Sequence, residues 1–66
     1  MWTVVFIANN RTTAETYKDI LQKEGLLVQL RSIGTANQGD AGAVEILVPE
    51  SEAEEAHEII ISSRGA

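Results

Sequence analysis

An apolar run near the start of the chain decides the fold, Trp2-Thr3-Val4-Val5-Phe6-Ile7-Ala8. It is dense in β-branched and aromatic side chains, which favour a strand. Its apolar residues fall at both odd and even positions, so the pattern predicts a strand over residues 2–8 that is largely covered on both faces. Asn9-Asn10-Arg11 then ends the strand, because asparagine favours turns and caps.

A helix over residues 12–24 is predicted next. Thr12 and Glu15 match a capping box, in which the side chain of each residue accepts a hydrogen bond from the backbone N–H of the other. Gly25 follows where a left-handed residue commonly ends a helix. The apolar stripe of this helix comprises Ala14, Tyr17 and Leu21, with Ile20 beside it.

Three further elements complete the chain. Residues 26–33 alternate between apolar and polar and predict a second strand, and a polar connection over residues 34–42 contains three glycines. Residues 43–48 predict a third strand that Pro49 ends. Ser51 and Glu54 match a second capping box and predict a helix over residues 52–62.

This order of elements favours one α+β architecture. The first strand, helix and second strand form a right-handed crossover, and the third strand returns from the second as a hairpin. If the third strand inserts between the other two, the strand order is 1-3-2 and both helices cover one face. This is the ferredoxin-like β-α-β-β-α arrangement without its final strand, with a three-stranded antiparallel or mixed sheet.

Two features of this arrangement predict self-association, with a dimer favoured. The first strand is an apolar edge strand, which invites pairing with another chain. One sheet face lacks helices, and either Trp2, Val4 and Phe6 or Thr3, Val5 and Ile7 point to it. The alternative is that these side chains only complete a thin core. The predicted self-association residues are Trp2, Val4, Phe6 and Leu47.

A ligand-binding site is predicted at one end of the sheet. The first and second strands run parallel, so the loop after the first strand and the glycine-containing loop should be neighbours there. Free N–H groups at the start of the first helix, together with Arg11, could hold a small anion. The alternative is a solvated surface arginine beside ordinary loops. The residues of this predicted site are Asn9, Asn10, Arg11, Gln38 and Asp40.

Composition excludes several function classes. The 66 residues carry a net charge of −5, and the five basic residues are scattered, which argues against binding nucleic acid or an anionic membrane. No cysteine is present, so neither a disulfide nor a cysteine-based zinc site can stabilise so small a core, and association is the remaining means. No signal or membrane-spanning run is visible, and a cytoplasmic protein is expected.

Catalytic chemistry has little support in the sequence. His57 is the only histidine, and the serines sit at a strand end, a helix cap and a tail, without a nucleophile motif. Glu54, His57 and Glu58 share a helical face, but a solvated acidic face explains them better than a metal site. We therefore expect no cofactor, no metal and no enzymatic activity in a single copy, whereas a site between subunits remains open.

Three segments together resemble a known family. They are Met1 to Ala8, Leu21 to Val28 with its Glu24-Gly25-Leu26, and Val44 to Glu50 with its Val48-Pro49-Glu50. They are similar to the putative prokaryotic signal-transducing proteins, a bacterial family of unknown function that resembles the PII regulators. The resemblance implies a ferredoxin-like sheet and a regulatory or binding role. The chain is far shorter than true PII regulators and lacks a recognisable nucleotide loop, so nucleotide sensing does not carry over.

The leading hypothesis is a non-enzymatic regulatory or binding module that works as a homo-oligomer and senses a small anion or docks onto a protein. One alternative is an enzyme with a site between subunits. Similar short sequences carry a glutamate decarboxylase label. Such an enzyme needs a large pocket for pyridoxal phosphate and a positioned lysine. Lys18 and Lys23 instead fall on the exposed side of the first helix. A second alternative is an adaptor whose first strand pairs with a partner strand.

Overall fold

The computed structural model describes residues 1–33 and 42–65. The predicted order of strand, helix, strand, strand and helix is confirmed, with a short 3₁₀ helix added before the last element. The elements are β1 (Trp2–Ala8), α1 (Arg11–Lys23), β2 (Gln29–Ser32), β3 (Val44–Pro49), η2 (Glu50–Glu52) and α2 (Ala53–Gly65).

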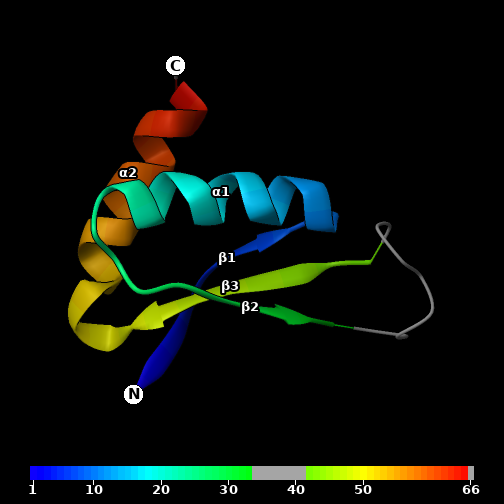
Figure 1. The fold of residues 1–66 in the computed structure, drawn as a ribbon, viewed down its shortest axis with the longest axis horizontal. Helices are drawn as coiled ribbons and strands as arrows, with labels where there is room; N and C mark the ends of the chain where they lie inside the picture. The colour runs from blue at the N-terminus through cyan, green and yellow to red at the C-terminus, as the bar shows by residue number, and fades with distance from the viewer. Residues whose placement is uncertain (34–41, 66) are drawn as a thin grey trace.

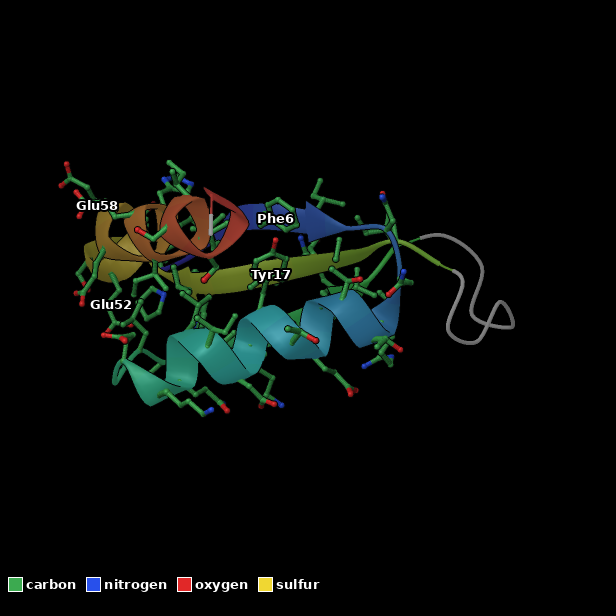
Figure 2. All side chains as sticks on the ribbon, turned by 90° about the horizontal axis from the view of Figure 1, so that it is seen from above. Phe6, Tyr17, Glu52 and Glu58 are labelled. Atoms are coloured by element: carbon green, nitrogen blue, oxygen red, sulfur yellow. The ribbon has the colours of Figure 1, made fainter. Side chains whose placement is uncertain are left out.

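The strands form one sheet in the order β1-β3-β2, and β3 is antiparallel to both of its neighbours. The sheet is therefore fully antiparallel, and β1 and β2 are its two edges. Figure 1 shows α1 and α2 on the same side of this sheet, and the view in Figure 2 looks onto the two helices with the strands beneath them. The predicted α+β fold with strand order 1-3-2 is confirmed.

A β-bulge in β1 changes which of its residues face the helices. Val4 lies opposite Leu47, and Phe6 lies opposite Ile46, so Val5 is an extra residue between two consecutive pairs. The simple alternation predicted for this strand is therefore wrong beyond Val4. Phe6 packs against the core beneath the helices, while Ile7 moves to the opposite face.

The core lies between the sheet and the two helices. Leu21, Ile46 and Val48 are fully buried at its centre, and α2 adds Ala56 and Ile60. The predicted stripe of α1, through Ala14, Tyr17 and Leu21, therefore meets apolar residues of α2 and of the sheet in one cluster. Its buried members are Val5, Ala8, Ala14, Leu21, Leu26, Val44, Ile46, Val48, Ala56 and Ile60.

Gly25 ends α1 as predicted. Its φ is +90°, and the N–H groups of Gly25 and Leu26 donate to the carbonyl oxygens of Gln22 and Leu21, at 3.0 and 3.2 Å. These are the two hydrogen bonds of a Schellman motif. They also explain why β2 begins at Gln29 rather than at residue 26, because Leu26 is held by the helix end and buried in the core.

A second contact fixes the connection between α1 and β2, one residue after Leu26. The backbone N–H of Leu27 donates to Glu52 Oε1 of η2 at 3.0 Å, so Leu27 also lies outside β2. A side chain distant in sequence thus helps to delay the start of the predicted strand, which a local pattern cannot reveal.

The last helix differs from its prediction at both ends. Helical backbone begins at Glu50 as η2, so Ser51, the predicted cap, lies within a helical turn. The α-helix then runs to Gly65 rather than ending at residue 62. Pro49 is the last residue of β3 and pairs with Trp2, at a strand end where its missing N–H costs no ladder hydrogen bond.

Replacing Gly25 by alanine should destabilise the fold by about 1 kcal/mol, because a side chain disfavours this left-handed backbone. Nothing lies within 4 Å of the added Cβ, so backbone strain is the expected cause. Urea unfolding at fixed protein concentration measures the loss. Gln22→Ala, an exposed change in the same helix, is the control and should stay within about 0.5 kcal/mol of wild type. Equal stability of Gly25→Ala and wild type would contradict this account.

Candidate functional site

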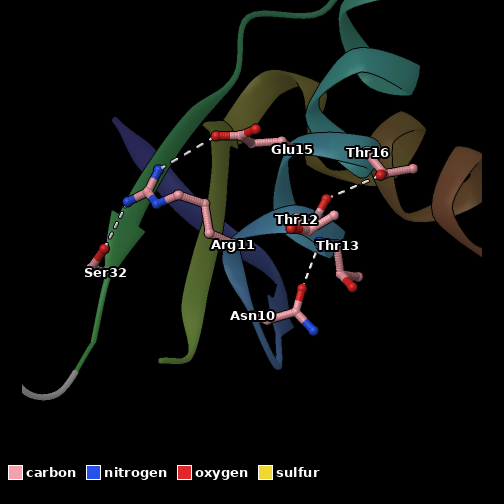
Figure 3. Close-up of polar contacts among 7 residues, drawn as sticks. All are labelled: Asn10, Arg11, Thr12, Thr13, Glu15, Thr16 and Ser32. Atoms are coloured by element: carbon pink, nitrogen blue, oxygen red, sulfur yellow. Dashed lines mark hydrogen bonds and ion pairs between the residues drawn. The ribbon is translucent and has the colours of Figure 1, made fainter. Parts of the chain in front are cut away.

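The start of α1 is capped by Asn10, not by Thr12 as predicted. Asn10 Oδ1 accepts a hydrogen bond from the backbone N–H of Thr13 at 2.7 Å, as Figure 3 shows. The extended backbone of Asn10 suits an N-cap position. The helix therefore begins at Arg11, and one of the N–H groups assigned to an anion is already satisfied.

Arg11 contacts two side chains of this chain (Figure 3). Its Nη2 donates to Ser32 Oγ at 2.9 Å, and its Nη1 lies 3.9 Å from Glu15 Oε2. The contact with Ser32 places the start of α1 beside the end of β2, as the parallel direction of β1 and β2 predicts. Sequence reasoning missed Ser32, which carries no local signal for this contact.

The anion hypothesis for this end of the sheet stays a prediction. Asn9 is exposed, Asn10 caps the helix, and Arg11 faces the carboxylate of Glu15. Gln38 and Asp40, also assigned to the site, lie outside the described residues. The arrangement brings together Asn10, Arg11 and Ser32, and the guanidinium is already engaged by two oxygen-bearing groups.

A second candidate site is the sheet face away from the helices, which we call the open face. Cross-strand partners share a face, so the register of β1 and β3 places Trp2 beside Pro49, Val4 beside Leu47 and Ile7 beside Glu45. β2, the other neighbour of β3, contributes Gln29 and Arg31 to the same face. Ile33 continues the same alternation just past β2. The open face comprises Trp2, Val4, Ile7, Gln29, Arg31, Ile33, Glu45, Leu47 and Pro49.

Leu47 forms the centre of the open face. It is only 7% exposed, yet it does not belong to the cluster beneath the helices. Val4 and Gln29 flank it directly, and Trp2 lies on the diagonal next to it. Trp2 and Ile7 remain 40% and 52% exposed. The open face thus carries a small apolar cluster that the chain itself covers incompletely.

The charges on the open face neutralise each other. Arg31 Nε donates to Glu45 Oε1 at 2.6 Å, and its Nη2 lies 2.6 Å from the same oxygen. The two residues are cross-strand partners on β2 and β3, so the backbone register holds them together. This surface is therefore mainly apolar and carries no net charge from its described residues.

Three of the four residues predicted for self-association lie on this face, namely Trp2, Val4 and Leu47. Phe6 does not, because the bulge turns it toward the helices, where its ring lies 4.9 Å from that of Tyr17 (Figure 2). Ile7 takes its place on the open face. Only the register across the bulge reveals this exchange, since the sequence of β1 fits either alternation.

A shallow, open groove of about 370 Å³ lies between the C-terminal end of α1 and α2. Its apolar part is formed by Ile20 and Ile59, one from each helix, and both are half-buried. Carboxylates and hydroxyls surround this part. The remaining lining residues are Glu24, Glu55, Glu58, Ser62 and Ser63.

The described residues contain no cluster of three His, Cys, Asp or Glu side chains placed to hold a metal ion. His57 is exposed on α2, next to Glu58 along the helix. Among the helices of the described ranges, none is long and apolar enough to cross a membrane.

Comparison with protein families gives one match. The model of the family described as "putative prokaryotic signal transducing protein" matches residues 2–64, which is nearly the whole chain. Comparisons with curated proteins and with solved structures find no match. The match agrees with the resemblance seen in the sequence and assigns neither a ligand nor a catalytic residue.

Replacing Asn10 by alanine should cost about 1 kcal/mol of stability, because the N–H of Thr13 loses its acceptor. Asn10→Asp should retain most of that stability, since aspartate caps equally well. Asn9→Ala is the matched control, as Asn9 is exposed and precedes the cap. The measurement is urea unfolding at one protein concentration. Equal losses in Asn9→Ala and Asn10→Ala would show that Asn10 does not cap the helix.

Proposed function

This chain belongs to the putative prokaryotic signal transducing protein family, and within it we propose that the chain is a non-enzymatic regulatory or binding module that works as a homodimer. The open face is the proposed dimer contact. Two copies would pack these faces together and leave both helical layers outward, available to other partners.

The observation that carries the proposal is the separation of charge from apolar surface. Of the ten acidic residues, Asp40 is not described, and Glu45 is paired with Arg31 on the open face. The other eight lie on α1, its C-cap, η2 or α2. They are Glu15, Asp19, Glu24, Glu50, Glu52, Glu54, Glu55 and Glu58. Two acidic chains can therefore meet through their open faces with little repulsion.

The small size of the domain supports association. A chain of this length buries only about 60% of the surface that its unfolded form exposes. Burying Trp2, Ile7 and the surroundings of Leu47 against a second copy would extend the apolar core. Each long apolar side chain removed from water stabilises by roughly 1.5–3 kcal/mol when fully buried.

The open face fits this contact better than the β1 edge does. A regular strand can add a partner strand along its whole length, whereas a bulge disrupts the ladder and bends the strand. The bulge at Val5 lies in the middle of β1. Edge pairing with a partner strand is therefore the less favoured mode.

We expect no catalysis by a single copy. Ser32 accepts a hydrogen bond from Arg11, whose guanidinium has donors but no acceptor for the hydroxyl proton, and His57 is exposed on α2. Neither arrangement activates a nucleophile, which requires a base within hydrogen-bond reach of the attacking group.

Ile7→Lys should convert the dimer to monomers, because a charged side chain would be placed at the proposed contact. The change is compatible with the fold, since Ile7 is half-exposed and lies opposite Glu45, which can pair with lysine. The control is Ile61→Lys, an isoleucine on α2 that is 66% exposed and outside the open face. Sedimentation equilibrium should show a dimer for wild type and Ile61→Lys, and at least about tenfold weaker association for Ile7→Lys.

Two outcomes would overturn the proposed contact. Wild type that stays monomeric at high micromolar concentration would exclude the homodimer. A dimer that persists unchanged in Ile7→Lys would place the contact elsewhere, with the β1 edge as the next surface to test.

Trp2 gives a second readout of the same contact. It is the only tryptophan of the chain and is 40% exposed on the open face. Dimerisation through this face should bury its indole and shift its fluorescence emission to shorter wavelength as the concentration rises. Ile61→Lys should show the same shift, and Ile7→Lys should not. An emission spectrum independent of concentration across the dimerisation range would contradict burial of Trp2.

A further inference from the structure

The groove between α1 and α2 has a surface chemistry distinct from that of the open face. Its apolar part comes from Ile20 and Ile59, and its polar part includes Glu24 on the α1 side and Glu55 on the α2 side. Glu58 also lines the groove, although its side chain projects outward from α2 on the side away from α1 (Figure 2). The groove therefore combines an apolar strip with carboxylates contributed by both of its walls.

No basic side chain is among the lining residues that the structure describes, whereas three carboxylates are. Glu24 is also the C-cap of α1, so the negative end of the helix dipole lies at this wall. Glu24 and Glu55 are both exposed, and neither takes part in the ion pairs found within the described residues. Among the described side chains, none therefore pairs with Glu24 or Glu55, and both can meet a cation from outside.

We infer that this groove binds a basic segment of a partner protein, with a lysine or arginine side chain laid across Ile20 and Ile59. Such side chains have an apolar stem and a charged head, which match the apolar strip and the carboxylates respectively. The groove is open to solvent and has a volume of about 370 Å³, so it suits one or two long side chains laid along a surface rather than an enclosed small molecule.

Binding here does not depend on the dimer. The groove lies in the helical layer, and the open face lies on the opposite side of the sheet. A monomer and a dimer would both present the groove to solvent. Failure of the homodimer and failure of this inference are therefore separate results.

The test uses a labelled amphipathic peptide of leucine and lysine, with a peptide of the same pattern in which glutamate replaces lysine as its control. Binding is followed by fluorescence anisotropy with the full chain, and the contact is mapped by NMR chemical-shift changes. The lysine peptide should bind and the glutamate peptide should not. The largest shifts should fall on Ile20, Glu24, Ile59 and Ser62.

The double variant Glu24→Gln/Glu55→Gln removes one carboxylate from each wall of the groove while preserving side-chain shape. Its control, Asp19→Asn/Glu54→Gln, removes the same charge from exposed positions of the same two helices outside the groove. We expect the groove variant to bind the lysine peptide about three- to tenfold more weakly, as the loss of two exposed ion pairs predicts, and the control to change less than twofold.

Three results would overturn the inference. The first is absence of binding by the lysine peptide. The second is equal weakening in both double variants, which would mean attraction to the acidic surface as a whole. The third is a set of shifts located on the open face or at the start of α1. Circular dichroism of each variant establishes that the fold is retained.

Discussion

The pairing of β1 with β3 is the constraint on which the rest of the structure depends. β3 is the central strand, and every residue of β1 except Val5 is assigned to a layer by its partner there. The extra residue at Val5 sends Phe6 to the helices, where it meets Tyr17, and sends Ile7 to the open face. One irregular position therefore decides both the packing of α1 on the sheet and the apolar character of the uncovered surface.

Much of this architecture could be predicted because it follows from local patterns. The spacing of Ala14 and Leu21, the alternation of β3 and the position of Gly25 each reflect one element alone. The strand order follows from the handedness and shortness of connections. These rules require no knowledge of which distant residues meet.

The features that escaped prediction all depend on contacts between elements or on competition between similar residues. Thr12 and Asn10 are both residue types that suit a helix cap, and in the structure Asn10 caps α1. The late start of β2 depends in part on Glu52, and the role of Ser32 depends on Arg11. The bulge has no signature in an apolar run such as β1. For the candidate site, the sequence therefore indicated an uncovered face but assigned Phe6, rather than Ile7, to it.

The bulge also bears on how the chain tolerates changes in length. Val4 and Phe6 face consecutive residues of β3, Leu47 and Ile46, so removing Val5 would leave every other cross-strand pair in register. The cost in stability would come from the loss of one buried valine side chain. In β3, which has a neighbour on each side, loss of one residue would shift both ladders and exchange core and surface residues. Insertions and deletions among relatives should therefore collect in β1 at this position and spare β3.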